Sequence, residues 1–389
     1  MESPERARLL TPAFLVISAG SLAYFLSLGV LVPAVPLYVE GPLRGGEVAV
    51  GLAVGVFSIS GFLFRPWAGR LGDRRGRRPI IVGGAVLVAF SVLGYLLAHT
   101  PSVIVGLRFV TGIGEAFFFV GAASAVADLA PEDRRGEALS LFSLALYAGI
   151  GLGPILGEAA VEGLGFGAAW IAAAALAIVA AVLGLAVPET RVEAEEEASV
   201  GQPLIHRGAI RPGVILWANL VAMAGFFAFL PLYAPEAGLE GSRLIFLLFS
   251  VVVIAVRSAG ARIPDRIGPR RASLGALIST AAGMLVLAAW PGAAGVVTGT
   301  VVLAVGQALA FPALMTLAMR GVSSAERGSL VGTFTAFVEV AFGLGPVLLG
   351  FVAAGFGFRG AFLAGGVVAL SGLLLLPPAR TPAEARSHD

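Results

Sequence analysis

Cysteine and lysine are both absent from this 389-residue sequence, and charge of either sign is scarce. Without cysteine, the chain can form no disulfide, no thiolate metal site and no cysteine nucleophile. Charged residues make up 13% of the chain, whereas soluble domains carry about 25%. A chain so poor in charge cannot cover a soluble surface, so its composition excludes a soluble enzyme. A net charge of only +2 also argues against a nucleic-acid partner.

Long apolar runs recur along the whole chain, of which 58% is hydrophobic. A run of about 20 apolar residues can cross a hydrocarbon core ~30 Å thick. Within lipid only helices and closed barrels satisfy their own backbone groups, and these runs lack the alternation of barrel strands. The sequence therefore predicts an all-α membrane protein with twelve transmembrane helices, at 12–39, 48–69, 79–98, 102–128, 137–160, 165–187, 211–234, 243–262, 271–290, 293–319, 328–354 and 358–376.

The placement of arginine predicts how these helices are oriented. Nearly all of the arginines lie in the two tails and in the loops after every second span, whereas the opposite loops hold only Arg44, Arg243 and Arg359. Basic loops remain on the cytoplasmic side of a membrane. We therefore expect an integral protein of the cytoplasmic (inner) membrane of a prokaryote, with both termini in the cytoplasm and the lipid bilayer as its surroundings.

The chain repeats itself at a shift of 192 residues, which places Arg65 on Arg257 and Asp73 on Asp265. The acidic and polar segment 189–210 separates the copies, so we expect an N-terminal bundle over 1–188, a cytoplasmic linker over 189–210 and a C-terminal bundle over 211–389. Each copy has an even number of spans, so both enter the membrane in the same sense. Two pseudo-symmetric six-helix bundles of this kind place a substrate between them, near the midplane of the membrane.

Three short motifs add chemistry to this architecture. GRLGDRRGRRPII at 69–81 fits the pattern G-x-L-x-D-R-x-G-R-[RK], RFVTGIGEA at 108–116 fits R-x-x-x-G-x-G, and GIGLGPILG at 149–157 fits G-x-x-x-G-P-x-x-G. Together they resemble the signatures of the major facilitator superfamily, and the third resembles that of its antiporter branch. The resemblance covers nearly the whole chain and implies a transporter similar to the twelve-helix drug–proton antiporters.

The resemblance gives the first motif a role as a latch that joins the bundles on the cytoplasmic side when the transporter opens outward. We expect Asp128, at the end of the fourth span, to lie close enough to pair with Arg77. A plain topology signal is the alternative interpretation of this charged loop. The residues expected to form the cytoplasmic gate are Gly69, Asp73, Gly76, Arg77, Arg78 and Asp128.

The third motif places three glycines on roughly one face of the fifth span, at Gly149, Gly153 and Gly157, with Pro154 beside them. Glycines at this spacing let another helix approach closely, and proline permits a kink. Close packing alone would account for the pattern. The resemblance to antiporters implies, in addition, a flexible seal that limits leakage.

Ionisable residues are rare deep inside the spans, where each costs roughly 2.5–3.5 kcal/mol to insert. Those present are Arg108 and Glu115 in the fourth span and Glu339 in the eleventh. No histidine lies within a span, so a proton relay would use carboxylates. We expect Glu115 and Glu339 to couple transport to protons, and the resemblance implies that Arg108 assists. The alternative is that these three side chains serve only in helix packing.

Overlaying the copies pairs further polar positions, including Tyr147 with Glu339 and Glu115 with Gln307. Aromatic side chains surround these positions, and they either line the cavity or, as the alternative, face the lipid or pack in the core. The residues expected in the substrate cavity are Tyr24, Tyr147, Asn219, Gln307, Phe118, Phe226 and Phe311, with Phe25, Phe117, Phe227 and Phe337 as further aromatic candidates.

These observations predict a secondary transporter, not an enzyme, that exports a small hydrophobic or amphipathic compound in exchange for protons by alternating access. No phosphate-binding loop is present to harness ATP, and we expect no cofactor and no metal, a proton as the coupling ion, and a monomer. The alternative within transport is a proton-coupled importer of a sugar or organic anion, with Arg108 as counter-ion of the substrate. A sensor or scaffold on the same fold would need neither a latch nor buried acids.

Overall fold

The computed structural model describes residues 11–131, 134–190, 206–260, 267–319, 322 and 326–377, and the described part is helical with no strand. This confirms the predicted all-α fold. The helices of the first half are α1 (Pro12–Glu40), α2 (Gly46–Arg75), α3 (Arg77–Leu93) with the short 3-10 turn η1 (Gly94–Leu97), α4 (Pro101–Leu129), α5 (Arg135–Leu164) and α6 (Phe166–Leu185). Those of the second half are α7 (Arg207–Glu236), α8 (Arg243–Gly260), α10 (Pro269–Ala289), α11 (Ala293–Ala318), α12 (Arg327–Ser371) and the 3-10 turn η5 (Gly372–Leu375).

Each predicted span has a helical counterpart among the described residues. Within the described ranges, ten helices are long and apolar enough to cross a membrane. The 45-residue α12 contains two predicted spans, because its backbone leaves the helical conformation at Gly357, where φ is 70°. Glycine adopts positive φ at little cost, so the chain turns back there. The last part of the predicted span 243–262 lies outside the described residues, and α8 fills the rest.

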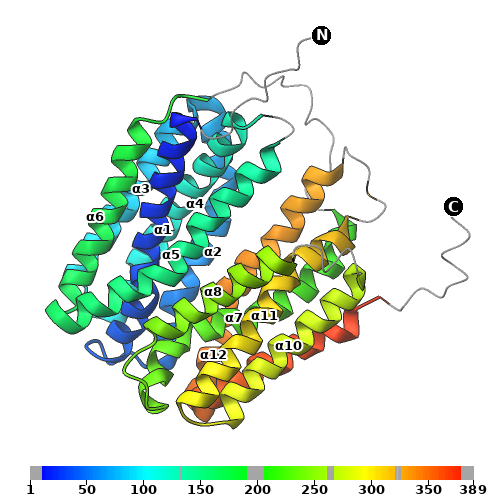
Figure 1. Cartoon of the computed structure of the whole chain (residues 1–389). Helices are drawn as coiled ribbons and strands as arrows, with labels where there is room; N and C mark the ends of the chain where they lie inside the picture. Colours follow the sequence, from blue (N-terminus) through cyan, green and yellow to red (C-terminus); the bar gives the residue numbers. More distant parts are fainter. Residues whose placement is uncertain are drawn as a thin grey trace, which may run out of the picture.

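The helices form two groups that lie against each other (Figure 1). In the N-terminal group (α1–α6), α1 packs on α5 and α6, while α4 packs on α2 and α3. In the C-terminal group (α7–η5), α12 packs on α7 and α10, and α10 on α11. The groups meet mainly where α2 touches α12 and where α5 touches α8. Most of the predicted linker lies outside the described residues, which end at 190 and resume at 206.

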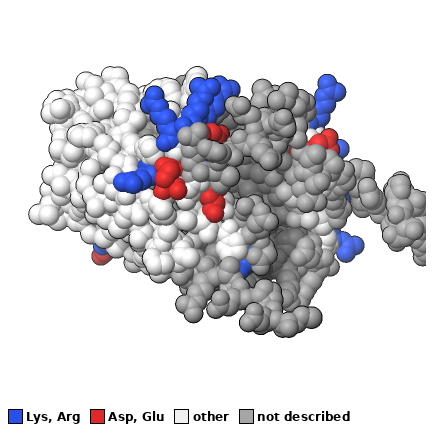
Figure 2. Space-filling model, turned by 90° about the horizontal axis from the view of Figure 1, so that it is seen from above, with Lys and Arg blue, Asp and Glu red and all other residues white. Residues whose placement is uncertain are grey.

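One end of the molecule carries a cluster of exposed charged side chains, and we call it the charged end. The charged end carries the exposed side chains of Arg70, Asp73, Arg74, Arg75 and Arg78, where α2 ends and α3 begins. Basic and acidic side chains gather there when the molecule is seen from above (Figure 2). The opposite end lies where α1 ends at Glu40 and α2 begins.

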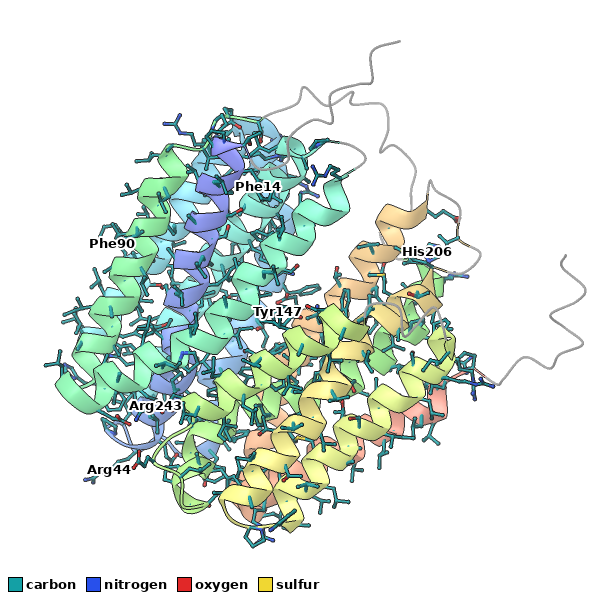
Figure 3. All side chains as sticks on the ribbon, in the orientation of Figure 1. Phe14, Arg44, Phe90, Tyr147, His206 and Arg243 are labelled. Carbon is teal, nitrogen blue, oxygen red and sulfur yellow. The ribbon has the colours of Figure 1, made fainter. Side chains whose placement is uncertain are left out.

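The sides of the molecule between these ends are apolar. Ile171 of α6, Val251 of α8 and Val367 of α12 are each at least 54% exposed, and Phe90 points outward from α3 (Figure 3). Such a surface is stable next to hydrocarbon and unstable next to water. The chain is therefore an integral membrane protein.

The two groups come closest through small residues near the opposite end. Gly51 and Gly55 of α2 lie against the backbone of Pro346 and Gly343 of α12, so a side chain on either α2 glycine would collide with that backbone. Small residues at a membrane helix interface let the backbones approach closely and gain van der Waals contact. This interface runs toward mid-depth, where the candidate site begins.

Candidate functional site

An ion cluster of Arg65, Glu115 and Glu339 joins the two helix groups at mid-depth. Arg65 on α2 places Nη2 3.4 Å from Glu115 Oε1 on α4 and Nη1 2.7 Å from Glu339 Oε1 on α12. The two acids therefore come from different groups and share one guanidinium. Their side chains are 10% and 14% exposed, and that of Arg65 is 26% exposed.

Local sequence explains how Arg65 reaches both acids. Gly61, one helical turn before Arg65, faces Glu115 Oε2, so a larger residue there would crowd the carboxylate. Phe119, one turn after Glu115, lies below the guanidinium with its ring centre 4.9 Å from Arg65 Cζ. Stacking on an aromatic ring favours arginine over a more mobile lysine. The guanidinium is thus fixed by two carboxylates and a ring.

The sequence indicated both acids of this cluster but not its arginine. Arg65 lies a few residues before the charged motif, and the sequence distinguishes it only as a position of the repeat. One signal could have identified it, because its repeat partner Arg257 also lies within a span. Arg257 lies over the ring of Tyr147, 4.8 Å from its centre, and so also links the groups.

A cavity of about 200 Å³ lies between the groups, near this cluster. Arg108 and Ser58 are the polar side chains of its lining, and the other lining residues are apolar. Helices α1, α2, α4 and α5 supply one wall, while α7 and α12 supply the other. The lining is Phe25, Leu28, Gly29, Leu31, Val32, Val35, Val54, Phe57, Ser58, Arg108, Leu146, Ile150, Met223, Phe227 and Phe342.

Arg108 is 8% exposed, and its guanidinium lies beside the cavity. Its Nε donates a hydrogen bond to the backbone carbonyl of Ala53, 3.0 Å away, and its Cζ lies 4.3 Å from the ring centre of Phe57. Within the described ranges, no carboxylate lies within 4.0 Å of Arg108. Its positive charge is therefore held without an acidic partner.

The lining of this cavity differs from the set of residues that the sequence led us to expect in a substrate cavity. Phe25, Phe227 and Arg108 line the cavity, whereas the seven residues first expected in a substrate cavity are not among its lining residues. Tyr24 and Phe118 are fully buried and stack on each other with ring centres 3.7 Å apart. They occupy the packing between α1 and α4, because the period of a helix cannot tell a cavity-facing ring from a core ring.

The remaining five predicted cavity residues also have partners elsewhere. Asn219 donates from Nδ2 to Gln307 Oε1 at 3.1 Å, which joins α7 to α11 within the C-terminal group. Tyr147 faces the C-terminal group (Figure 3) beneath Arg257. The other two pack on neighbouring aromatic rings, Phe226 on Phe249 and Phe311 on Phe334.

Glu158 joins the groups at the opposite end. Its carboxylate, on α5, accepts hydrogen bonds from the backbone N–H of Ser242 at 2.8 Å and of Arg243 at 3.1 Å, and from the Ser242 hydroxyl. These N–H groups belong to the start of α8, which attracts negative charge. Arg243 also pairs with Glu162 at 2.6 Å. We call Glu158, Glu162, Ser242 and Arg243 the end clamp; Arg243 is labelled in Figure 3.

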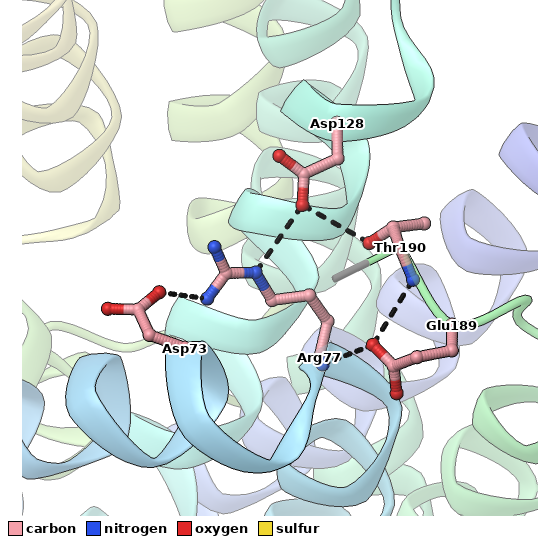
Figure 4. Close-up of polar contacts among 5 residues, drawn as sticks. All are labelled: Asp73, Arg77, Asp128, Glu189 and Thr190. Atoms are coloured by element: carbon pink, nitrogen blue, oxygen red, sulfur yellow. Dashed lines mark hydrogen bonds and ion pairs between the residues drawn. The ribbon is translucent and has the colours of Figure 1, made fainter. Parts of the chain in front are cut away.

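The predicted gate residues at the charged end contact their own group. Arg77 donates from Nη1 to Asp73 Oδ1 at 2.6 Å and from Nε to Asp128 Oδ2 at 3.4 Å. Thr190 and Glu189, which the sequence did not indicate, complete the cluster, in which Glu189 Oε1 accepts from the Arg77 N–H at 2.7 Å (Figure 4). Among the described residues this cluster makes no ion pair or hydrogen bond to the C-terminal group.

Two of the gate glycines and the exposed Arg78 occupy distinct places near this cluster. Gly76 joins α2 to α3 with φ of 99°, a conformation that disfavours larger residues. Gly69 has open space around it, and Arg78 is exposed.

The glycines of the third motif form the contact between α5 and α1. A side chain on Gly149 would collide with Phe25, one on Gly153 with Gly29, and one on Gly157 with Val30. The two backbones are thus in direct contact beside Pro154, which lies within α5. This packing closes one wall of the cavity, because Gly29 and Phe25 also line it. In the part of the chain that the structure describes, no three His, Asp or Glu side chains gather as a metal site would require.

Comparison with known proteins agrees with this architecture. The family model of the Major Facilitator Superfamily matches residues 17–322 and 244–389. The uncharacterized MFS-type transporter STM4428 of Salmonella typhimurium is 28% identical over 365 residues, which cover 92% of this chain and 93% of that protein. The fold is similar to the crystal structure of the nucleoside transporter NupG, with a TM-score of 0.74, 14% identity, and coverage of 95% of this chain and 100% of that one. It is also similar to the human organic anion transporter MFSD10, with a TM-score of 0.68, 20% identity, and coverage of 97% and 100%. The chain belongs to the major facilitator superfamily of transporters.

Proposed function

We propose that this transporter exports a small hydrophobic or amphipathic compound in exchange for protons. The observation that supports this most is the ion cluster, in which Arg65 holds Glu115 of one group and Glu339 of the other. A proton-coupled transporter needs a titratable group whose charge affects how its two halves contact each other. Glu339 meets this need, because its ion pair with Arg65 crosses between the groups.

Charge counting shows how a proton would act on this cluster. With both acids ionised, two negative charges share one positive charge, which leaves a net charge of −1 in a buried place. One proton makes the cluster neutral, and buried charge is costly unless it is paired. A proton on Glu339 would remove the ion pair across the interface and loosen the groups. A proton on Glu115 would leave Arg65 fully available to Glu339.

The two ends of the molecule support an alternating-access cycle. By the positive-inside rule the charged end faces the cytoplasm, with both termini on that side of a prokaryotic inner membrane. The described hydrogen bonds and ion pairs between the groups lie at mid-depth and in the end clamp. We therefore assign this structure to a state closed toward the outside. In the outward-open state the contacts of the end clamp would break. The charged cluster at the charged end (Asp73, Arg77, Asp128, Glu189 and Thr190) would then serve as the latch that the first motif implies.

The second candidate is a proton-coupled importer of a sugar or organic anion. The cavity argues against a sugar, because sugar hydroxyls require many hydrogen-bonding groups and this lining offers Ser58 and Arg108. An anion remains compatible with either direction of transport.

Proteoliposomes with a pH-sensitive dye inside would test the proposal. A pH gradient is imposed, and lipophilic cations, sugars and organic anions are added in turn to wild type, Glu115→Gln and Glu339→Gln. Glu236→Gln is the matched control, because Glu236 is exposed at the opposite end. We expect substrate-evoked proton movement in wild type and the control, and its loss in at least one cluster variant. Substrate movement with no proton flux, equal in all four proteins, would overturn the proposal.

The direction of transport is measured separately, in membrane vesicles of known sidedness. Export predicts that an inward-directed proton gradient expels a preloaded substrate. Accumulation of that substrate under the same gradient would establish the importer instead.

A further inference from the structure

We infer that the cavity binds an amphipathic organic monoanion, with its carboxylate or sulfonate on Arg108 and its apolar part against the α1 and α7 walls. This inference rests on the proposed transport function and names the substrate class for it. Three features carry it: the charge of Arg108, the arrangement of the acids around it, and the chemistry of the lining.

Arg108 is a buried cation that has no acidic partner among the described residues. A guanidinium stays charged at any physiological pH and carries five N–H donors. In Arg108 the carbonyl of Ala53 takes one donor, and the face of the group rests on Phe57. A buried charge without a counter-ion is costly, so this site gains from any anion that reaches it. A guanidinium matches the two oxygens of a carboxylate.

The two acids of the ion cluster do not supply that counter-ion in this state. Glu115 lies two turns further along α4, ~10.5 Å away along the axis, and Arg65 holds it. Glu339 is held by Arg65 as well. Arg65 therefore keeps both carboxylates away from Arg108 and leaves its charge for the substrate.

The remainder of the lining specifies an apolar body. Phe25 and Leu28 of α1 face Met223 and Phe227 of α7 across the cavity, with Phe342 of α12 beside them. Such a wall attracts hydrocarbon and offers nothing to a polar chain. A volume of about 200 Å³ suits a single ring or a short alkyl chain. A cationic compound would meet Arg108 with repulsion, and a dianion would leave one charge unpaired.

A ligand-induced thermal shift of the purified protein would test this without any transport step. The probes are benzoate, octanoate and octanesulfonate, each compared with a neutral amide and a primary amine of the same carbon skeleton. The proteins are wild type, Arg108→Gln, Arg108→Lys and Arg271→Gln, the last because Arg271 is exposed on α10.

We expect saturable stabilisation of wild type by one or more of the anions and at least tenfold weaker stabilisation by its amide and amine. Arg108→Gln should bind that anion at least tenfold more weakly, Arg108→Lys should retain part of the affinity, and Arg271→Gln should match wild type. If Arg108→Gln fails to fold, Ile150→Phe, which fills the cavity and keeps the charge, should weaken binding of octanoate instead. Equal binding of amide and anion, full binding by Arg108→Gln, or no shift with any anion overturns the inference.

The outcome separates this inference from the proposed function. Anion binding that depends on Arg108, with no anion-evoked proton flux in the proteoliposomes, would leave the inference standing and overturn proton coupling. Proton exchange driven by lipophilic cations and unaffected by Arg108→Gln would do the reverse.

Discussion

At the scale of single residues, one arginine determines how the buried acids are arranged. Arg65 is the point at which Glu115 and Glu339 meet, although the two lie in different helix groups. Its repeat partner Arg257 makes a ring contact with Tyr147 and, among the described residues, no ion pair. The two arginines therefore occupy equivalent positions in the repeat but have different surroundings, which permits a direct comparison.

Replacing Arg65 with glutamine is expected to destabilise the protein, because two buried carboxylates then face each other without a cation. Leaving a buried charged group without its partner costs about 1–3 kcal/mol or more, so we expect a lower thermal midpoint in detergent and loss of substrate-evoked proton flux. Arg257→Gln is the matched control and should lose less stability. A variant at Arg65 as stable as wild type, or less perturbed than the one at Arg257, would contradict this prediction.

The charged residues of this site could be predicted from the sequence only where they lie deep within a span. Buried charge is rare in a span, so Glu115, Glu339 and Arg108 stand out by type and depth alone. Arg65 does not stand out, because it lies beside a charged loop and resembles an extension of that loop. The aromatic positions were harder, since Tyr24 and Phe118 have the same composition and spacing as Phe25 and Phe227, and only packing decides which pair faces the cavity.

At the scale of helices, the sequence was more informative, since apolar length alone locates each span. Its limits appear where backbone conformation matters. Gly357 lets two spans join without a loop, and the start of α8 is shaped by Glu158, which lies far away in sequence. The third motif indicated a glycine face on α5, and the structure shows that α1 lies against these glycines.

The contact between α5 and α1 leads to a prediction about sealing. In Gly153→Leu the new side chain collides with the α1 backbone at Gly29, and overpacking of this kind costs about 1–3 kcal/mol. We expect a lower thermal midpoint and a faster passive proton leak in dye-loaded vesicles. Gly163→Leu is the control on the same helix, because nothing lies near that glycine. Equal leak and equal stability in both variants would show that the glycine face is not a seal.

At the scale of the whole molecule, the two ends are held by different chemistry. The end clamp joins the groups through a carboxylate and backbone N–H groups, whereas the charged cluster of Figure 4 is satisfied within one group. A rocking transporter must break one set of contacts as it forms the other, so each must be strong enough to select a state and weak enough to release it. The clamp has one buried acid, Glu158, and one exposed pair, Arg243 with Glu162.

Removing the buried member of the clamp should favour the outward-open state. Met223 lines the cavity, and because the chain has no cysteine, Met223→Cys gives a single thiol that reports access from outside. Hydrogen bonds to a charged group contribute about 1.5–3 kcal/mol, and ~1.4 kcal/mol is a factor of ten in an equilibrium. In right-side-out vesicles, adding Glu158→Ala should therefore raise the rate of labelling by an impermeant maleimide about tenfold or more.

The control is Glu162→Ala, which removes only an exposed pair that contributes about 0–1 kcal/mol, and it should raise the rate of labelling far less. If both variants label at the wild-type rate, Glu158 shapes the start of α8 without holding the outer side closed, and the state closed toward the outside must depend on the glycine contacts between α2 and α12.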